Sequence, residues 1–102
     1  MRKYDICYSC QADKDLDDLF EVIVFEYGVP ETAFKYVQGI IETIENLSKN
    51  PEIYAIRYNR SLIQYGQFVR RVNYKKMAIL YSIYDNMVYI HRIIASSLIT
   101  GL

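Results

Sequence analysis

The first residues of the chain alternate between apolar and polar positions. In the segment Lys3–Ser9 every second side chain is apolar, and these side chains are Tyr4, Ile6 and Tyr8. Because successive side chains of a strand point to opposite faces, this alternation predicts a half-buried strand.

The spacing of apolar residues then changes to that of helices. From about Gln11 they recur every three or four positions, and Gly28 predicts the end of this helix. Pro30 suits the first turn of a second helix, which Asn50-Pro51 is expected to end. The joint between the two helices is so short that they must form an antiparallel hairpin.

The second half of the chain is typical of strands. Residues 67–74, 77–84 and 87–94 are rich in β-branched and aromatic side chains, whereas residues 53–59 fit either a strand or an extended arm. Asp85-Asn86 has the composition of a two-residue hairpin turn. An N-terminal strand, a helical hairpin and then an antiparallel β-meander together predict an α+β fold of two layers.

The Asp85-Asn86 turn also predicts a register. It pairs Tyr84 with Met87, Ser82 with Tyr89, and Leu80 with His91. We expect the helices to cover the more apolar face of these strands, which carries Ile79, Tyr81, Ile83, Val88 and Ile90. The other face, with Ala78, Leu80, Ser82, Tyr84, Met87, Tyr89, His91 and Ile93, has no helix assigned to it. We expect a partner or a second copy to cover Leu80, Tyr84, Met87 and Tyr89 there.

Composition bounds the class of protein. The chain has 102 residues, of which 52% are hydrophobic and 24% charged, so one globular domain over residues 1–102 is expected and disorder is excluded. No apolar run reaches the roughly 18–20 residues of a membrane span, and the N-terminus does not have the pattern of a signal peptide. We therefore expect a cytoplasmic protein without membrane contact.

Charge is distributed unevenly along the chain. Residues 1–52 carry five basic and eleven acidic side chains, a difference of −6, whereas residues 53–102 carry seven basic and one acidic, a difference of +6. This separation predicts a basic surface that could bind nucleic acid or an acidic protein segment. The basic side chains of that half are Arg57, Arg60, Arg70, Arg71, Lys75, Lys76 and Arg92.

The cysteines and the single histidine give weak signals of chemistry. Cys7 and Cys10 form a CxxC, but neither a second cysteine pair nor a βαβ unit accompanies it, so we expect ordinary buried or half-buried thiols, no metal and no cofactor. His91 cannot form a catalytic triad by itself.

Several short motifs resemble, in their order and spacing, the RelE/ParE superfamily of type II toxin–antitoxin toxins. The first motifs are Tyr4-x-Ile6-x-Tyr8-Ser9, Ala12-x-x-Asp15-Leu16, Ala33 and Leu47-x-x-Asn50-Pro51. The later ones are Arg71, Met77-Ala78-Ile79-Leu80-Tyr81-x-Ile83 and Val88-x-Ile90-x-Arg92-Ile93. The resemblance covers nearly the whole chain and implies the superfamily's α+β fold.

The resemblance implies two mechanisms. RelE-like members cut messenger RNA at the ribosome, whereas ParE-like members bind DNA gyrase. This chain departs from the superfamily's pattern at three places. Ala78 stands where a strand arginine is common, Ala95 stands where a late histidine is common, and Leu98-Ile99 stands where an Arg-Asp pair commonly follows. We therefore favour a ParE-like, non-catalytic toxin that a cognate antitoxin neutralises. One alternative is a ribosome-dependent mRNA interferase of the RelE type, in which Arg70, Arg71 and Arg92 would supply charge and His91 would supply proton transfer. The other is a degenerate, non-toxic interaction domain.

The favoured interpretation predicts a binding surface. Its expected residues, for a target or an antitoxin, are Arg57, Arg60, Leu80, Tyr84, Met87 and Tyr89. The sequence leaves open whether the chain forms a homodimer or a toxin–antitoxin hetero-oligomer.

Overall fold

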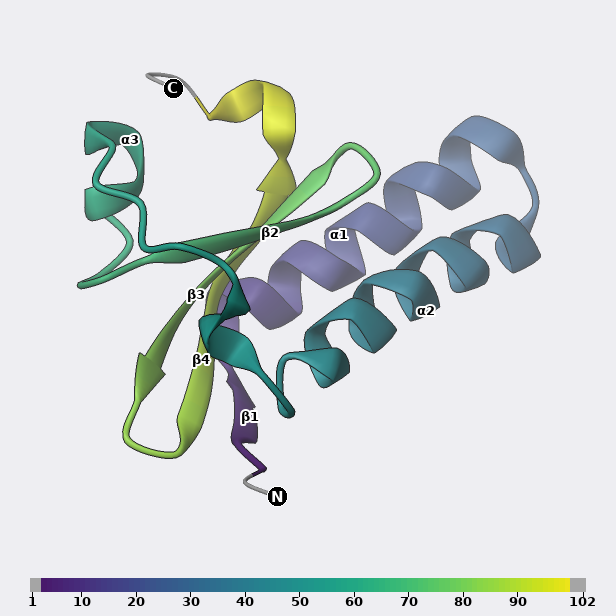
Figure 1. The fold of residues 1–102 in the computed structure, drawn as a ribbon. Coiled ribbons are helices and arrows are strands. Elements are labelled where there is room, and N and C mark those ends of the chain that lie inside the picture. Colours follow the sequence, from purple (N-terminus) through teal and green to yellow (C-terminus); the bar gives the residue numbers. More distant parts are fainter. Residues whose placement is uncertain (1–2, 100–102) are drawn as a thin grey trace.

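A computed structural model describes residues 3–99 (Figure 1). The regular elements are, in order, β1 (Asp5–Tyr8), α1 (Cys10–Tyr27), α2 (Pro30–Asn46), α3 (Arg60–Ile63), β2 (Arg70–Tyr74), β3 (Met77–Tyr84) and β4 (Met87–Ala95). Two 3₁₀ turns, η1 (Pro51–Ile53) and η2 (Ser96–Leu98), lie between or after them. The predicted order of strand, helical hairpin and meander is confirmed, and the short α3 is an addition.

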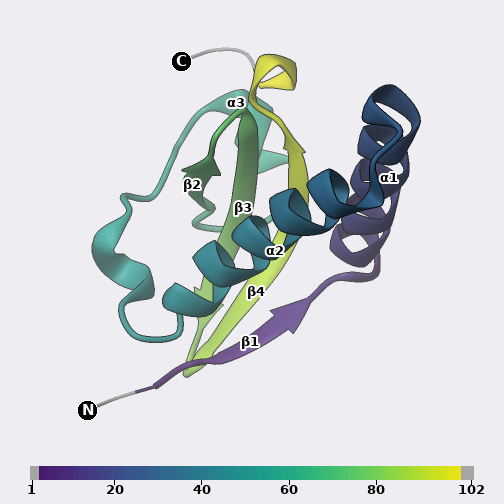
Figure 2. The ribbon, with the colours of Figure 1, turned by 90° about the vertical axis from the view of Figure 1, so that its right-hand side faces the viewer.

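The four strands form one sheet in the order β1-β4-β3-β2. β1 runs parallel to β4, and the other neighbours are antiparallel. The hairpin of α1 and α2 lies on one face of the sheet, and α3 lies on the opposite side (Figures 1 and 2). The main core lies between the hairpin and the sheet, and its largest fully buried members include Ile40, Ile44, Ile79, Tyr81, Val88 and Ile90.

The helix ends follow the expected chemistry with one exception. The Ser9 side chain accepts a hydrogen bond from the Ala12 N–H at 2.9 Å and caps α1. Gly28 ends α1 in the left-handed region with φ of 67°, and Pro30 opens α2. The expected end of α2 at Asn50-Pro51 is wrong, because the chain already leaves the helix after Asn46 and Pro51 begins η1.

The register of β3 and β4 agrees with the prediction only near the turn. Tyr84 pairs with Met87 and Ser82 with Tyr89, as expected, but Leu80 pairs with Arg92 instead of His91. A β-bulge at His91 causes the shift. It lies where β1 stops pairing with β4, and there Ser9 Oγ donates to the His91 carbonyl at 2.8 Å.

The bulge also moves Ile93 to the other face. Ile93 was expected to share a face with Leu80, but it pairs with Ile79 and packs in the core under the helices. The expectation was wrong because one extra residue in a strand reverses the alternation of every side chain that follows.

The second face of the sheet is partly covered by the chain itself. Leu62 of α3 and Val69 pack with Ala78, Leu80 and Ile94 in a second, smaller core. Leu80 is fully buried there, so the expectation that a partner or a second copy covers it is wrong. Periodicity did not predict this cover because α3 has only four residues.

The segments on either side of α3 complete this cover. Residues 53–59 form an arm, in which Ile56 makes an isolated antiparallel bridge to Arg70 of β2. The strand that was expected to begin at residue 67 begins at Arg70, because residues 64–69 form the loop that lies over the second face.

Candidate protein-binding groove

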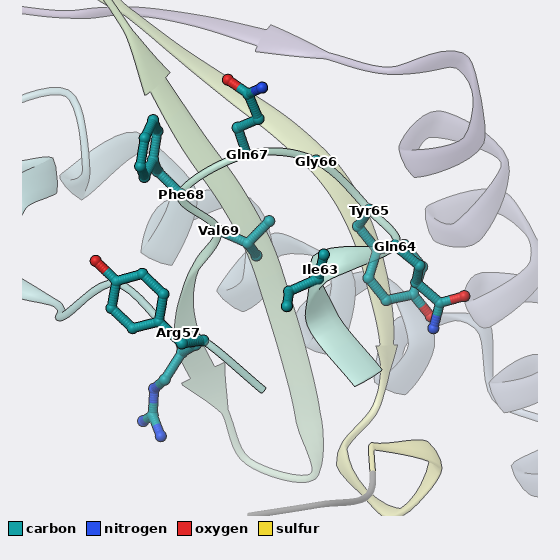
Figure 3. Close-up of a pocket in the computed structure, with 9 residues that line it drawn as sticks. Arg57, Ile63, Gln64, Tyr65, Gly66, Gln67, Phe68 and Val69 are labelled. Carbon is teal, nitrogen blue, oxygen red and sulfur yellow. The ribbon is translucent and has the colours of Figure 1, made fainter. Parts of the chain in front are cut away.

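An open groove lies beside α3 on the second face of the sheet (Figure 3). Its volume is about 520 Å³, and its walls come from the arm, α3 and the loop that follows α3. The groove is lined by Arg57, Tyr58, Ile63, Gln64, Tyr65, Gly66, Gln67, Phe68 and Val69. Tyr58, Ile63 and Phe68 are 73%, 57% and 62% exposed, so its rim is apolar and open to solvent. An exposed apolar concavity of this kind is typical of a protein-binding surface.

Hydrogen bonds and a left-handed residue hold the loop of the groove in place. Ser82 Oγ on β3 donates to the Gln67 carbonyl at 2.8 Å. Phe68 has φ of 54°, which turns the chain so that Val69 enters the second core while Phe68 stays exposed. Gly66 lies against the His91 ring, where an added Cβ would come within 2.7 Å of Cε1. The groove is therefore a formed feature of the fold rather than a gap beside it.

Three arginines lie at or near the groove: Arg57 lines it, Arg60 begins α3, and Arg71 lies close enough to Arg57 to feel its charge. Arg57 and Arg60 are exposed, and neither forms an ion pair within residues 3–99. Burial lowers the pKa of Arg71, and the nearby charge of Arg57 lowers it further. Two like charges this close repel each other, and a bound carboxylate or phosphate would relieve the repulsion.

Arg92, one of the four candidates for RNA chemistry, is engaged in the fold. Its Nε and Nη2 donate to the two carboxylate oxygens of Asp15 at 2.8 and 3.0 Å. The same carboxylate accepts from the Ile93 N–H at 2.9 Å. Asp15 therefore joins α1 to the edge of β4 just beyond the bulge, and the hydrogen bond to Asp15 raises the pKa of Arg92.

His91 is buried and also has a structural partner. Its Nε2 lies 2.8 Å from Ser82 Oγ. A hydroxyl has one proton, and Ser82 donates it to Gln67, so Nε2 of His91 is the donor in this bond. Burial lowers the pKa of His91 and favours its neutral form.

Arg70 and Arg71 point to opposite faces of β2. Arg71 pairs with Leu80 on the groove side, whereas Arg70 pairs with Tyr81, whose ring lies in the core under the helices. Arg70 donates to the backbone carbonyls of Glu52 at 3.3 Å and Tyr54 at 2.6 Å. Arg70 and Arg71 are adjacent in the sequence and were expected to share one basic surface. The structure instead places them on opposite faces of the sheet.

The predicted binding residues that remain accessible lie beside the groove. Tyr84 is 40% exposed, and its ring centroid lies 6.2 Å from that of Tyr89. The Tyr89 ring meets His91 edge-on at 5.1 Å, so an aromatic row leads from the groove toward the β3–β4 turn. Met87 pairs with Tyr84 and is half-buried. Sequence reasoning missed Tyr58, Ile63 and Phe68, whose only signal is that they are apolar outside any periodic segment.

The remaining candidate chemistry is limited. Cys7 and Cys10 are free and exposed, which corrects the expectation of buried or half-buried thiols. Cys10 is exposed because it opens α1. Within residues 3–99, no group of three or more His, Cys, Asp or Glu side chains could hold a metal ion. No helix in that part of the chain is long and apolar enough to cross a membrane.

Comparisons with known proteins agree with this geometry. A family model described as the ParE toxin of the type II toxin–antitoxin system parDE matches residues 6–97. No curated protein sequence matches the chain. A solved structure of the chromosomal ParDE system from P. aeruginosa has a TM-score of 0.76 and 23% identity, and the match covers 91% of this chain and 96% of that chain.

A second similar structure is the RelBE2 toxin–antitoxin complex from Mycobacterium tuberculosis. Its TM-score is 0.63 at 18% identity, and the match covers 93% of each chain. At these identities the two structures establish the fold, while the family model spans nearly the whole sequence. The chain therefore belongs to the ParE toxin family of type II toxin–antitoxin systems.

Proposed function

We propose that the protein is a toxin that acts by binding DNA gyrase and does not cut RNA. The observation that supports this is the state of the RNA-cleavage candidates. Arg92 is bound by Asp15, His91 Nε2 is bonded to Ser82, and Arg70 is bonded to backbone carbonyls. Cleavage needs cationic donors and a proton-transfer group that are free to meet one phosphate. These three of the four candidates are already bonded within the fold, and the fourth, Arg71, points to the other face of β2 from Arg70. Gyrase is a cytoplasmic target, so we place the activity in the cytoplasm.

We also propose that the cognate antitoxin neutralises the toxin by placing an acidic, partly apolar segment in the groove. Arg57, Arg60 and Arg71 supply cations without acidic partners, and Ile63 and Phe68 supply exposed apolar surface. A helix or an extended segment with carboxylates beside apolar anchors fits such a surface. The aromatic row of Tyr84 and Tyr89 would extend the contact.

A supercoiling assay tests the target. The full chain, added to purified gyrase and relaxed plasmid, should block supercoiling, and its cognate antitoxin should restore it. In parallel, transcript ends are mapped on translating ribosomes after expression without the antitoxin. Discrete cuts at the ribosomal A site with unaffected gyrase would refute the proposal in favour of the interferase. Antitoxin binding without growth arrest would favour a degenerate, non-toxic domain.

A charge reversal tests the groove. Arg57→Glu should weaken antitoxin binding by about tenfold or more, because it turns attraction to a carboxylate into repulsion. Lys35→Glu is the matched control, since it makes the same charge change on exposed α2. Equal affinity for the two variants, measured by calorimetry, would place the antitoxin elsewhere.

A further inference from the structure

The outward side of α1 carries an exposed apolar ridge, formed by Val22 and Phe25. Phe25 is 89% exposed and Val22 is 52% exposed. At 100° per residue these two side chains lie on one stripe, with Glu21 on one flank and Glu26 on the other. The ridge is therefore an apolar strip between two carboxylates.

Within the part of the chain that the structure describes, the carboxylates beside the ridge form no close ion pair: the nearest cation acting on Glu21 is Lys14, which is bonded to Asp18. Glu21 and Glu26 are exposed and form no ion pair within residues 3–99. Glu26 stands in the last turn of α1, where the helix dipole disfavours negative charge and no basic side chain offsets it. A cationic surface docked on α1 would remove this unfavourable arrangement.

The groove beside α3 has the complementary properties. It is concave where the α1 ridge is convex, and its apolar rim includes the exposed Ile63 and Phe68. Arg57 lines it, Arg60 begins α3 in its wall, and Arg71 lies close enough to Arg57 to feel its charge. The only acid after residue 52 is Asp85. An exposed apolar side chain that fits a pocket elsewhere on the same molecule favours a contact between copies.

We propose that one copy of this chain docks its α1 ridge into the groove of a second copy, head to tail. Phe25 enters the groove against Ile63 and Phe68, and Glu21 and Glu26 meet the flanking arginines. A single chain cannot make this contact by itself, because the hairpin and α3 lie on opposite sides of the sheet (Figures 1 and 2). The contact buries apolar surface and neutralises charge on both sides.

Charge selects this arrangement over a symmetric one. Pairing two α1 ridges would bring carboxylates against carboxylates, whereas ridge against groove joins opposite signs. A head-to-tail contact leaves a free ridge and a free groove at the ends, so the assembly grows or closes into a ring. The head-to-tail contact fills the same groove that is proposed for the antitoxin, so the antitoxin and a second copy exclude each other there. The inference rests on the two surfaces alone and does not depend on the toxin's cellular target.

Sedimentation velocity of the purified full chain tests the contact. The wild type should associate as concentration rises. Association should weaken when ionic strength is raised from about 0.01 M to about 1 M, because the screening length falls from about 30 Å to about 3 Å. Phe25→Ser should weaken association by about tenfold or more, as expected for a central anchor. Phe34→Ser is the matched control, because Phe34 is 63% exposed on α2 and lies outside the ridge.

Mixing two variants separates head-to-tail docking from the alternatives. Phe25→Ser has an intact groove and Arg57→Glu an intact ridge. At a concentration just sufficient for the wild type to associate, each variant alone should therefore stay monomeric. An equimolar mixture should form dimers and stop there, since each pair has only one working contact. A wild type that is monomeric at all concentrations overturns the proposal, as does a mixture that stays monomeric. If Arg57→Glu alone associates like the wild type, the contact is symmetric through α1 and the proposal is wrong.

Discussion

The contact of Asp15 with β4 can be tested by removing its carboxylate. Asp15→Ala eliminates both bonds to Arg92 and the bond to the Ile93 N–H. The Asp15 side chain is 9% exposed and that of Arg92 is 29% exposed, so the pair is shielded from water but not fully buried.

The magnitude follows from these bonds. Leaving a backbone N–H without its acceptor costs about 1–3 kcal/mol. An ion pair of intermediate burial contributes about 1–2 kcal/mol, between the values for exposed and buried pairs. The higher helix propensity of alanine offsets about 0.5 kcal/mol of this loss in the free energy of unfolding. We expect Asp15→Ala to lower the free energy of unfolding by about 2–4 kcal/mol.

Urea denaturation followed by far-ultraviolet circular dichroism measures this change. Asp18→Ala is the matched control, since its pair with Lys14 is 2.9 Å long on the same helix but has side chains 57% and 65% exposed. That variant should lose no more than about 0.5 kcal/mol. A double-mutant cycle of Asp15→Ala with Arg92→Ala should give a coupling energy of about 1 kcal/mol or more. An Asp15→Ala variant as stable as Asp18→Ala would refute the structural role assigned to this carboxylate.

Three further predictions concern stability. Burial lowers the pKa of His91 from its usual 6.5, so the unfolded chain binds more protons than the folded chain, and the free energy of unfolding should fall as the pH drops below 6.5. In His91→Gln, urea titrations at each pH should show a weaker dependence of this free energy on pH. Leu80→Ala should lower the free energy of unfolding by about 3 kcal/mol because Leu80 is fully buried, whereas Tyr84→Ala, at a 40% exposed site, should lower it by less than about 1 kcal/mol. Equal losses for the two variants in urea denaturation would contradict the cover of Leu80 by α3. Gly28→Ala should cost about 1 kcal/mol in thermal unfolding because of its left-handed φ of 67°, and an unchanged midpoint would rule out that strain.

The sequence by itself determined the elements whose signal is local. The helical spacing after Gln11, the stop at Gly28 and the start at Pro30 specify the hairpin, because caps and periodicity act within a few residues. The Asp85-Asn86 turn specifies the register of its nearest pairs in the same way. The superfamily was also identifiable from the order and spacing of its motifs, and the family comparison confirms it.

Tertiary structure decided what depends on contacts between distant segments. The bulge at His91 lies where β1 ends and Ser9 bonds to β4, 82 positions away in sequence. It breaks the alternation that a single strand pattern predicts, and it brings Arg92 to Asp15. The four-residue α3 is too short to show a period, yet the packing of Leu62 against the sheet buries Leu80 and forms the groove. Which arginines stay free and which become structural is therefore a property of the assembled fold, because their partners come from segments that only folding brings together.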